Sequence, residues 1–165
     1  LLGNLGRVQA LTAAQGVLAV LHPHVGTMVE GPEDIRRVLD GSAIPFCLDT
    51  GHMFIGGTDP VRFAAEHADR IRHAHLKDVD LALAVTVREG KQTYYDATAA
   101  GMYRPLGAGD VDIAAIVRSL TAAGYDGWYV LEQDTVLRVE PPQGDGPIDD
   151  ARVSVEYLRS LLGEP

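Results

Sequence analysis

The sequence predicts an α/β fold that forms the C-terminal half of a (β/α)8 TIM barrel, with four parallel β/α units. Two observations lead to this prediction. Short apolar runs, the pattern of strands buried on both faces, alternate with amphipathic segments of helical period. Each apolar run also ends in polar residues, as in barrels whose sites form at the carboxyl ends of the strands. The expected strands are residues 17–21, 45–49, 71–76 and 128–132.

The length of the chain fits part of a barrel better than a whole one. A complete barrel typically needs about 250 residues, whereas the chain has 165 residues and does not begin with Met. We therefore expect a fragment, with residues 1–165 forming a single domain. The rival fold is a doubly wound open sheet, which carries a glycine-rich phosphate loop after its first strand. Residues 22–26, His-Pro-His-Val-Gly, are not such a loop, so the barrel is preferred.

Helices are expected between the strands and at both ends. Proline at the first helical position marks the start of helices 32–40 and 60–68, and Asp59 is expected to cap the second. The connection 78–109 is the longest, and an excursion of this length on the active-site side covers or completes a site. Trp128, at the base of the last strand, is expected in the core. The remaining expected helices are residues 5–15, 80–88, 94–100, 111–123 and 149–162.

Composition limits the classes of partner. The chain carries a net charge of -9 with a pI near 5.0, and an acidic surface repels the phosphates of nucleic acids. The single cysteine, Cys47, excludes an internal disulfide and favours a reducing compartment, so we expect a cytoplasmic location. Its apolar runs are shorter than the roughly 20 residues that span a bilayer. We therefore expect a small-molecule partner, with neither nucleic acid nor membrane, and a homo-oligomer is compatible with the sequence.

Polar residues at the strand ends predict a divalent metal site. Asp49, His75 and Glu132 follow three successive strands, and His22 or His24 follows the first strand. Mixed imidazole and carboxylate ligands suit Mn²⁺, Co²⁺, Fe²⁺ or Zn²⁺. The spacings follow no fixed motif, so the prediction rests on the repeated position at strand ends.

Other polar residues are assigned by their place on the strands and loops. Lys77 shares the strand face of His75 and could point into the same pocket, whereas we place His73 on the opposite face in a structural role. Cys47 shares the face of Asp49 one layer deeper and is assigned to packing. Tyr103 and Arg104, in the long connection, are candidate substrate contacts.

Five segments of the sequence resemble the xylose isomerase-like barrels. They are His22–Thr27, Leu48–His52, His73–Asp78, Gly101–Gly107 and Gly124–Asp134. The resemblance covers nearly the whole chain. Asp-Thr-Gly-His and His-Leu-Lys-Asp mark the superfamily, whereas the His-x-His-x-Gly-Thr and Gly-Met-Tyr-Arg-Pro-Leu-Gly segments are most similar to its inosose dehydratase branch.

The resemblance implies a divalent metal, with Mn²⁺ or Co²⁺ preferred, held by Asp49, His75 and Glu132. His22 is the fourth expected ligand, where sugar isomerases and epimerases of the superfamily usually carry Glu, and His24 is its alternative. The implied reaction is loss of water from 2-keto-myo-inositol in inositol breakdown, which makes the protein a hydro-lyase.

Roles follow for the residues around that metal. Glu132 is the candidate base, and Lys77 or His52 is the candidate acid for the departing hydroxyl. The candidate substrate-binding residues are His24, His52, Tyr103 and Arg104.

Two alternatives remain open at this point. A ketose isomerase or epimerase would use the same scaffold, because a fold does not determine a reaction. A non-catalytic polyol-binding module would keep the pocket without the chemistry. A nuclease on this scaffold is disfavoured, because the chain is acidic and carries no basic stripe.

Overall fold

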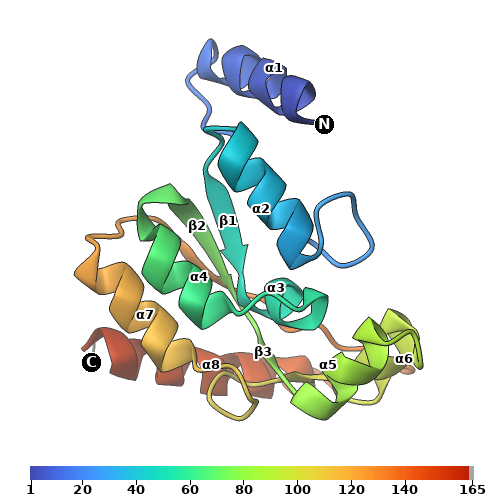
Figure 1. The fold of residues 1–165 in the computed structure, drawn as a ribbon. Coiled ribbons are helices and arrows are strands. Elements are labelled where there is room, and N and C mark those ends of the chain that lie inside the picture. The colour runs from blue at the N-terminus through green and yellow to red at the C-terminus, as the bar shows by residue number, and fades with distance from the viewer. Residues whose placement is uncertain (164–165) are drawn as a thin grey trace.

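A parallel sheet forms the centre of the molecule (Figure 1). β1 (Phe46–Asp49) pairs with β2 (Ile71–Leu76), and β2 pairs with β5 (Tyr129–Leu131), all in parallel. Leu21 extends the sheet through a parallel bridge to β1. The structure is a computed structural model that describes residues 1–163, so the expected domain boundary at residue 165 lies outside the described residues. The order and direction of these segments confirm the expected α/β fold with parallel strands.

The strand expected over residues 17–21 is wrong for most of its length, because it is reduced to the bridge at Leu21. The N–H of Leu21 donates to the carbonyl of Pro45, and its own carbonyl accepts from the N–H of Cys47, both at 2.8 Å. Further pairing toward the start of this segment would require an N–H from residue 45, and proline has none. Val17 and Leu18 are accordingly 56% and 63% exposed.

Helices flank the sheet, and several of the outer helices pack against each other (Figure 1). The expected proline starts are confirmed, and Asp59 caps its helix by accepting the N–H groups of Val61 and Arg62 at 2.9 and 3.1 Å. The outer helices, apart from those of the long connection, are α1 (Leu2–Ala13), which lies apart from the sheet, α2 (Pro32–Gly41), α4 (Pro60–His67), the short η1 (Ala68–Arg70), α7 (Ile113–Ala122) and α8 (Pro147–Leu162).

A helix that the sequence did not predict, α3 (Thr50–Gly56), follows β1 directly. Its glycines argue against a helix, but the capping carboxylate of Asp49 and close packing under the next strand stabilise it. A Cβ added at Gly51 would lie 2.8 Å from the Cβ of Lys77, so glycine allows this approach. The carboxyl end of β1 is therefore followed directly by a helix.

The long connection after β2 holds the two helices expected there, α5 (Leu81–Arg88) and α6 (Tyr94–Ala99). It also holds an unpredicted antiparallel pair, β3 (Asp78–Val79) with β4 (Tyr103–Arg104). Two-residue strands carry no periodic signal, which is why the sequence missed them. This pair fixes the start and the end of the excursion beside β2.

The core lies between the sheet and the outer helices, where fully buried side chains such as Phe46, Leu48, Ile71 and Leu120 meet. Trp128 is a correction to the expected core, because it is 78% exposed. Its carbonyl accepts the N–H of Ala74 at 3.1 Å, so the backbone joins the sheet. Trp128 directly precedes β5, which is an edge strand of the sheet within the described residues.

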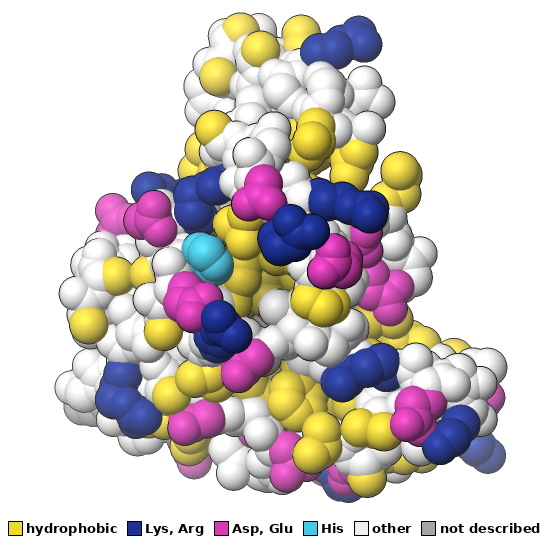
Figure 2. Space-filling view, in the orientation of Figure 1, with side chains coloured by type: hydrophobic (Ala, Val, Ile, Leu, Met, Phe, Trp, Pro, Cys, Tyr) yellow, Lys and Arg dark blue, Asp and Glu magenta, His cyan; other side chains and the backbone are white. Residues whose placement is uncertain are grey.

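The outer surface mixes charges of both signs. Figure 2 shows apolar side chains at the floor of a hollow and charged ones around its rim. A hollow of about 390 Å³ lies between α2 and α4, lined by Arg36 and Arg62 among others. Both arginines pair with acids on their own helices, Arg36 with Glu33 at 2.9 Å and Arg62 with Glu66 at 2.8 Å. Within residues 1–163, none of the helices has the length and apolarity required to cross a bilayer.

Candidate metal centre

The register of the sheet brings the expected site residues together. Asp49 of β1 lies opposite His75 of β2, and Leu76 lies opposite Leu131 of β5. Lys77 and Glu132 follow one residue later on their strands, so four polar side chains emerge at one edge of the sheet. This edge is the carboxyl end of the parallel strands, where the sequence placed the site.

Asp49 is fully buried, and its two oxygens have different partners. Oδ1 accepts the N–H of His52 at 2.8 Å and caps α3. Oδ2 lies 3.1 Å from Nε2 of His22. Burial opposes ionisation, but the hydrogen bond from His22, the nearby imidazole of His75 and the charge of Lys77 outweigh it and hold the pKa of Asp49 well below its ordinary value. Asp49 is therefore ionised at neutral pH.

The surroundings of Nδ1 of His75 show whether the site suits a cation. Its Nδ1 is buried and has no hydrogen-bond partner, yet it lies 3.5 Å from Oδ2 of Asp49 and 3.3 Å from Oε1 of Glu132. Ligand atoms of these three residues all lie within 4.8 Å of one another. One nitrogen facing two carboxylate oxygens is a donor set that suits a borderline divalent cation, so the residues present fit a metal ion.

Lys77 lies beside that donor set, with a side chain only 3% exposed. Its Nζ is 2.7 Å from Oε2 of Glu132, 3.1 Å from Oδ2 of Asp134 and 3.5 Å from Oδ2 of Asp49. Burial disfavours the ammonium ion, but the attraction of these carboxylates prevails and raises the pKa of Lys77 above its ordinary value. Lys77 is therefore a buried ammonium ion held by carboxylates.

His52 lies on α3, is 1% exposed, and serves as a partner of Lys77. Its Nε2 is 3.0 Å from Nζ of Lys77, and an ammonium ion can only donate, so Nε2 accepts and the ring proton lies on Nδ1. Burial is the main reason that the pKa of His52 falls to about 3. The ring is neutral and already hydrogen-bonded at Nε2.

The two histidines after Leu21 occupy different positions. The ring of His22 lies 4.9 Å from that of His75, with its Nε2 on Asp49. The ring of His24 lies 3.5 Å from that of His52, and its Nδ1 is 2.8 Å from the carbonyl oxygen of Val25. His22 therefore sits next to the carboxylate and imidazole of the donor set, and His24 stacks one position farther out.

The prediction that His73 points to the strand face opposite to His75 is wrong. Residues two apart in a strand point to the same face, and the rings of His73 and His75 lie 5.1 Å apart. Cys47 is buried as expected, and burial is the main reason that its pKa rises to about 12.

Tyr103 and Arg104 are not brought to the donor set directly. Tyr103 is 6% exposed, and its hydroxyl lies 2.6 Å from that of Tyr94. Arg104 pairs with Asp80 at 3.1 Å on the outer side of β4. Arg104 is therefore directed to Asp80 and not to the donor set.

A cavity of about 470 Å³ opens beside the donor set. Sequence reasoning missed two of its polar residues, Tyr94 and Asp134. Asp134 carried a usable signal, because it lies two residues beyond Glu132 and so can reach the same side, whereas Tyr94 lies in a connection without strand pattern. The lining residues are His22, His24, Lys77, Tyr94, Tyr95, Thr98, Glu132, Asp134, Thr135 and Val136.

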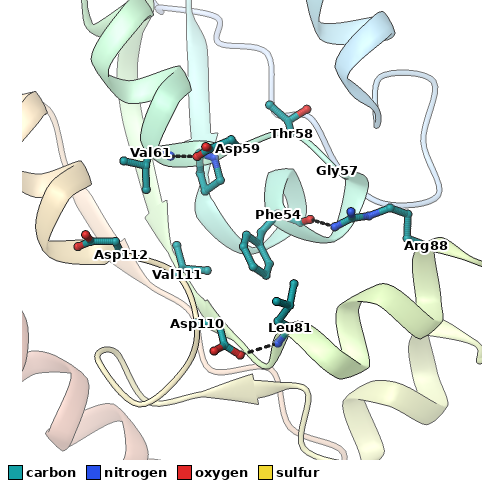
Figure 3. A pocket seen from close by; sticks show the side chains of 11 residues that line it. Phe54, Gly57, Thr58, Asp59, Val61, Leu81, Arg88, Asp110, Val111 and Asp112 are labelled. Atoms are coloured by element: carbon teal, nitrogen blue, oxygen red, sulfur yellow. Dashed lines mark hydrogen bonds between the residues drawn. The ribbon is translucent and has the colours of Figure 1, made fainter.

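A second cleft, of about 490 Å³, lies between α3, α4 and the start of α7 (Figure 3). Its charged side chains already form hydrogen bonds with the neighbouring backbone. Arg88 donates to the carbonyl oxygens of Phe54 and Ile55 at 2.6 and 3.0 Å, and Asp110 accepts the N–H of Leu81 at 2.7 Å. We therefore assign the chemistry to the cavity at the strand ends.

Comparison with known proteins places this site in a family. Residues 1–161 match the model of the xylose isomerase-like TIM barrel family. The chain is 34% identical to an inosose dehydratase of Geobacillus thermodenitrificans, over 99% of this chain and 54% of that protein. The chain spans about half the length of the curated relatives it matches.

Solved structures share the fold. A probable 3-DHS dehydratase, AsbF, from Bacillus anthracis matches with a TM-score of 0.68 at 20% identity, over 96% of this chain and 54% of that one. A zinc-bound IOLI protein matches with a TM-score of 0.68 at 14% identity, over 98% of this chain and 54% of that one. The match over nearly the whole chain, together with the parallel strands and their shared polar edge, shows that this chain belongs to the xylose isomerase-like TIM barrel family and resembles its inosose dehydratases.

Proposed function

We propose that the chain supplies the metal-binding and acid–base part of a hydro-lyase that removes water from 2-keto-myo-inositol. The similarity to inosose dehydratases supports the substrate. The observation that carries the reaction type is the pair of Glu132 and Lys77, whose charged groups lie 2.7 Å apart at the mouth of the cavity. A carboxylate beside an ammonium ion is a base beside an acid, which is what loss of a proton and a hydroxyl requires.

The proposed metal ligands are Asp49, His75 and Glu132, with His22 as the fourth. Their ligand atoms gather around the unpartnered Nδ1 of His75, which supports the assignment. His22 is preferred over His24 because its ring contacts both Asp49 and His75. A divalent cation here, with Mn²⁺ or Co²⁺ preferred, would supply Lewis-acid assistance to the loss of a proton next to the substrate ketone.

The proton transfers can be assigned to this chain's own residues. Glu132 takes the proton from the carbon next to the ketone, and Lys77 gives a proton to the departing β-hydroxyl, which leaves as water. The proton on Glu132 then passes to Lys77 across their 2.7 Å contact and restores both groups. His52 accepts a hydrogen bond from Lys77 in its neutral form, so we assign the acid role to Lys77 and a positioning role to His52.

The arrangement of bases favours elimination over epimerisation. Epimerisation next to a ketone is easiest with one base on each face of the substrate. The carboxylates that line the cavity, Glu132 and Asp134, both follow β5 and both contact Lys77. His22 and His24 also line the cavity, and the imidazole of His22, as a proposed ligand, would have its lone pair engaged. Among the described residues that line the cavity, a proton removed by Glu132 therefore has no carboxylate from a second strand to return it.

An isomerase or epimerase is the second candidate, because the same donor set would also assist proton transfer between neighbouring carbons. A polyol-binding module without turnover is the third. Candidate substrate contacts are His24 at the wall of the cavity and Tyr103, which acts through the hydroxyl of Tyr94. Arg104 would need to leave Asp80 to take part.

Product analysis separates these functions. The natural polypeptide that carries this chain, loaded with Mn²⁺ or Co²⁺, is incubated with 2-keto-myo-inositol and the products are followed by mass spectrometry and ultraviolet absorption. A dehydratase yields an absorbing dione that is lighter by one water. An isomer of unchanged mass would establish the second candidate, and substrate protection without turnover would establish the third.

A further inference from the structure

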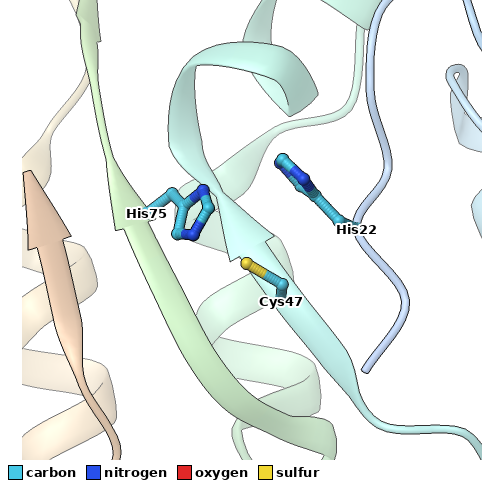
Figure 4. Close-up of side chains that lie close together, drawn as sticks. All are labelled: His22, Cys47 and His75. Carbon is cyan, nitrogen blue, oxygen red and sulfur yellow. The ribbon is translucent and has the colours of Figure 1, made fainter. Parts of the chain in front are cut away.

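Cys47 lies directly beneath the edge of the sheet that holds the site. It is 2% exposed and two residues before Asp49 on β1, so both side chains point to the same face. Figure 4 shows its thiol pointing toward the ring of His75, with the ring of His22 facing it from the neighbouring segment. One ligand atom from each of these three residues lies within 4.8 Å of the other two.

This cluster differs in chemistry from the upper donor set. The upper set of Asp49, His75 and Glu132 offers two oxygens and one nitrogen, whereas His22, Cys47 and His75 offer two nitrogens and one sulfur. Thiolate and imidazole select soft or borderline cations such as Zn²⁺, and carboxylates suit harder ones such as Mn²⁺. The two sets share His75, and His22 is also the proposed fourth ligand of the upper set, so an ion in one position removes both imidazoles from the other.

We propose that His22, Cys47 and His75 form a second metal position, one layer below the first, that takes a thiophilic divalent cation of the zinc and cadmium class. The two positions are alternatives for a single ion, because they share the imidazoles of His22 and His75. A hard cation occupies the carboxylate position, and a thiophilic cation moves inward to the sulfur.

The geometry is close to what such an ion requires. Tetrahedral zinc with bond lengths of about 2.0–2.3 Å places its ligand atoms about 3.5 Å apart. Ligand atoms within 4.8 Å of one another therefore need to approach by about 1 Å, which side-chain rotation of the two histidines supplies. His22 lines the cavity, and His22 and His75 retain 32% and 17% side-chain exposure, so both imidazoles are accessible to an ion.

Binding is a simple exchange of a proton for the ion. The S–H bond of Cys47 breaks, the bond between sulfur and the cation forms, and the proton leaves to solvent. No oxidation or reduction takes place. The fourth coordination position is open to water or to Asp49, which already contacts His22 at 3.1 Å.

Cadmium provides a direct probe of this position, because a cadmium–thiolate bond absorbs in the ultraviolet and shifts the ¹¹³Cd resonance strongly. The metal-depleted natural polypeptide is titrated with Cd²⁺ alone. We expect a thiolate band that saturates at stoichiometric Cd²⁺, and its loss in Cys47→Ala with at least about tenfold weaker Cd²⁺ binding. Mn²⁺, added alone, should bind equally well to both proteins.

Two further variants test the neighbours. His22→Gln should weaken the band and shift the ¹¹³Cd resonance, whereas Glu132→Gln, which alters the upper set alone, should leave the band intact. A wild-type protein without a thiolate band at saturating Cd²⁺ would overturn the proposal, and this result needs no variant to fold. A band that His22→Gln leaves unchanged would also overturn it, because the sulfur would then bind alone. Neither measurement involves turnover, so the dehydratase proposal can stand or fall separately.

Discussion

Asp49 uses its two carboxylate oxygens for different purposes. Oδ1 caps α3 through the N–H of His52, and Oδ2 faces His22 and His75. The fold and the site therefore depend on different atoms of one side chain, and a substitution that keeps one oxygen can separate the two.

Asp49→Asn should retain the cap and lose the metal. The amide oxygen still accepts the N–H of His52, but the negative charge that attracts a cation is gone. We expect divalent metal affinity to fall by about tenfold or more, with little change in far-ultraviolet circular dichroism. Asp59→Asn is the matched control, because Asp59 caps α4 in the same way away from the site. Full metal retention in Asp49→Asn, by elemental analysis after dialysis, would remove Asp49 from the ligand set.

His52 should make the metal-free protein sensitive to acid. Its folded-state pKa is lowered to about 3, mainly by burial, against an ordinary value of 6.5. The unfolded chain therefore binds the proton first, and stability is lost as the pH falls from 6.5 toward 3. Each pKa unit corresponds to about 1.4 kcal/mol, so the loss amounts to a few kcal/mol.

His52→Gln should reduce this acid sensitivity, because glutamine can accept the hydrogen bond of Lys77 without titrating. Urea unfolding across this pH range, with a chelator present, measures how steeply the free energy of unfolding changes with pH for both proteins. An equal pH dependence of stability in the variant and the wild type would show that a group other than His52 takes up the proton on unfolding.

Sequence reasoning succeeded at the residue scale where a strand end fixed the position. Asp49, His75, Lys77 and Glu132 converge because parallel strands with matched register end at one edge. It was less informative for Arg104, whose pairing with Asp80 depends on a short antiparallel contact with no sequence signal.

Asp78 organises an element that the sequence left as a loop. It is fully buried, and its carboxylate accepts the N–H groups of Val79, Gly107, Gly109 and Val111 at 2.8 to 3.0 Å. It thereby ties the start of the long connection to its end, just before α7. The neighbouring Asp80 caps α5 from a more exposed position.

Asp78→Ala should destabilise the protein far more than Asp80→Ala. Removing Asp78 leaves the buried N–H groups of Val79 and Val111 unpaired, at about 1–3 kcal/mol each, whereas loss of a helix cap costs about 1 kcal/mol. Denaturant unfolding of both variants measures the difference. Similar losses would mean that water replaces the carboxylate of Asp78 in the loop.

The elements that the sequence predicted correctly have local signals. β2 matches the expected residues 71–76, and α4 begins at the expected Asp-Pro pair. α3 was missed because its helix depends on a cap and on packing under Lys77, which are tertiary features. The strand expected at residues 17–21 is shorter in the structure. The apolar pattern does not show the register, which places Pro45, without an N–H, where the next hydrogen bond would form.

At the scale of the whole molecule, neither edge of the sheet is paired with a further strand of residues 1–163. Leu18 lies before the bridge at Leu21 and is 63% exposed, and Trp128 lies at the start of β5 and is 78% exposed. Apolar strand edges without partners invite association. We propose that further β/α units complete a barrel along these edges, which also encloses the cavity.

The 165-residue chain on its own should therefore associate with itself. Sedimentation velocity should show concentration-dependent species, and the pair of changes Leu18→Lys and Trp128→Lys should reduce them. Leu137→Lys is the control, since Leu137 is 54% exposed on the loop after β5 and away from both edges. A monodisperse monomer with cooperative unfolding would show that the edges need no cover.

The exchange of the substrate's α-proton in D₂O is the most direct test of the claim that one base, Glu132, drives elimination. Proton NMR with 2-keto-myo-inositol should show dione formation by the metal-loaded natural polypeptide. Glu132→Gln should keep part of its metal but lose α-proton exchange by about a hundredfold or more, whereas Asp134→Asn should retain exchange. Undiminished exchange in Glu132→Gln, or accumulation of an epimer without dione, would contradict the account.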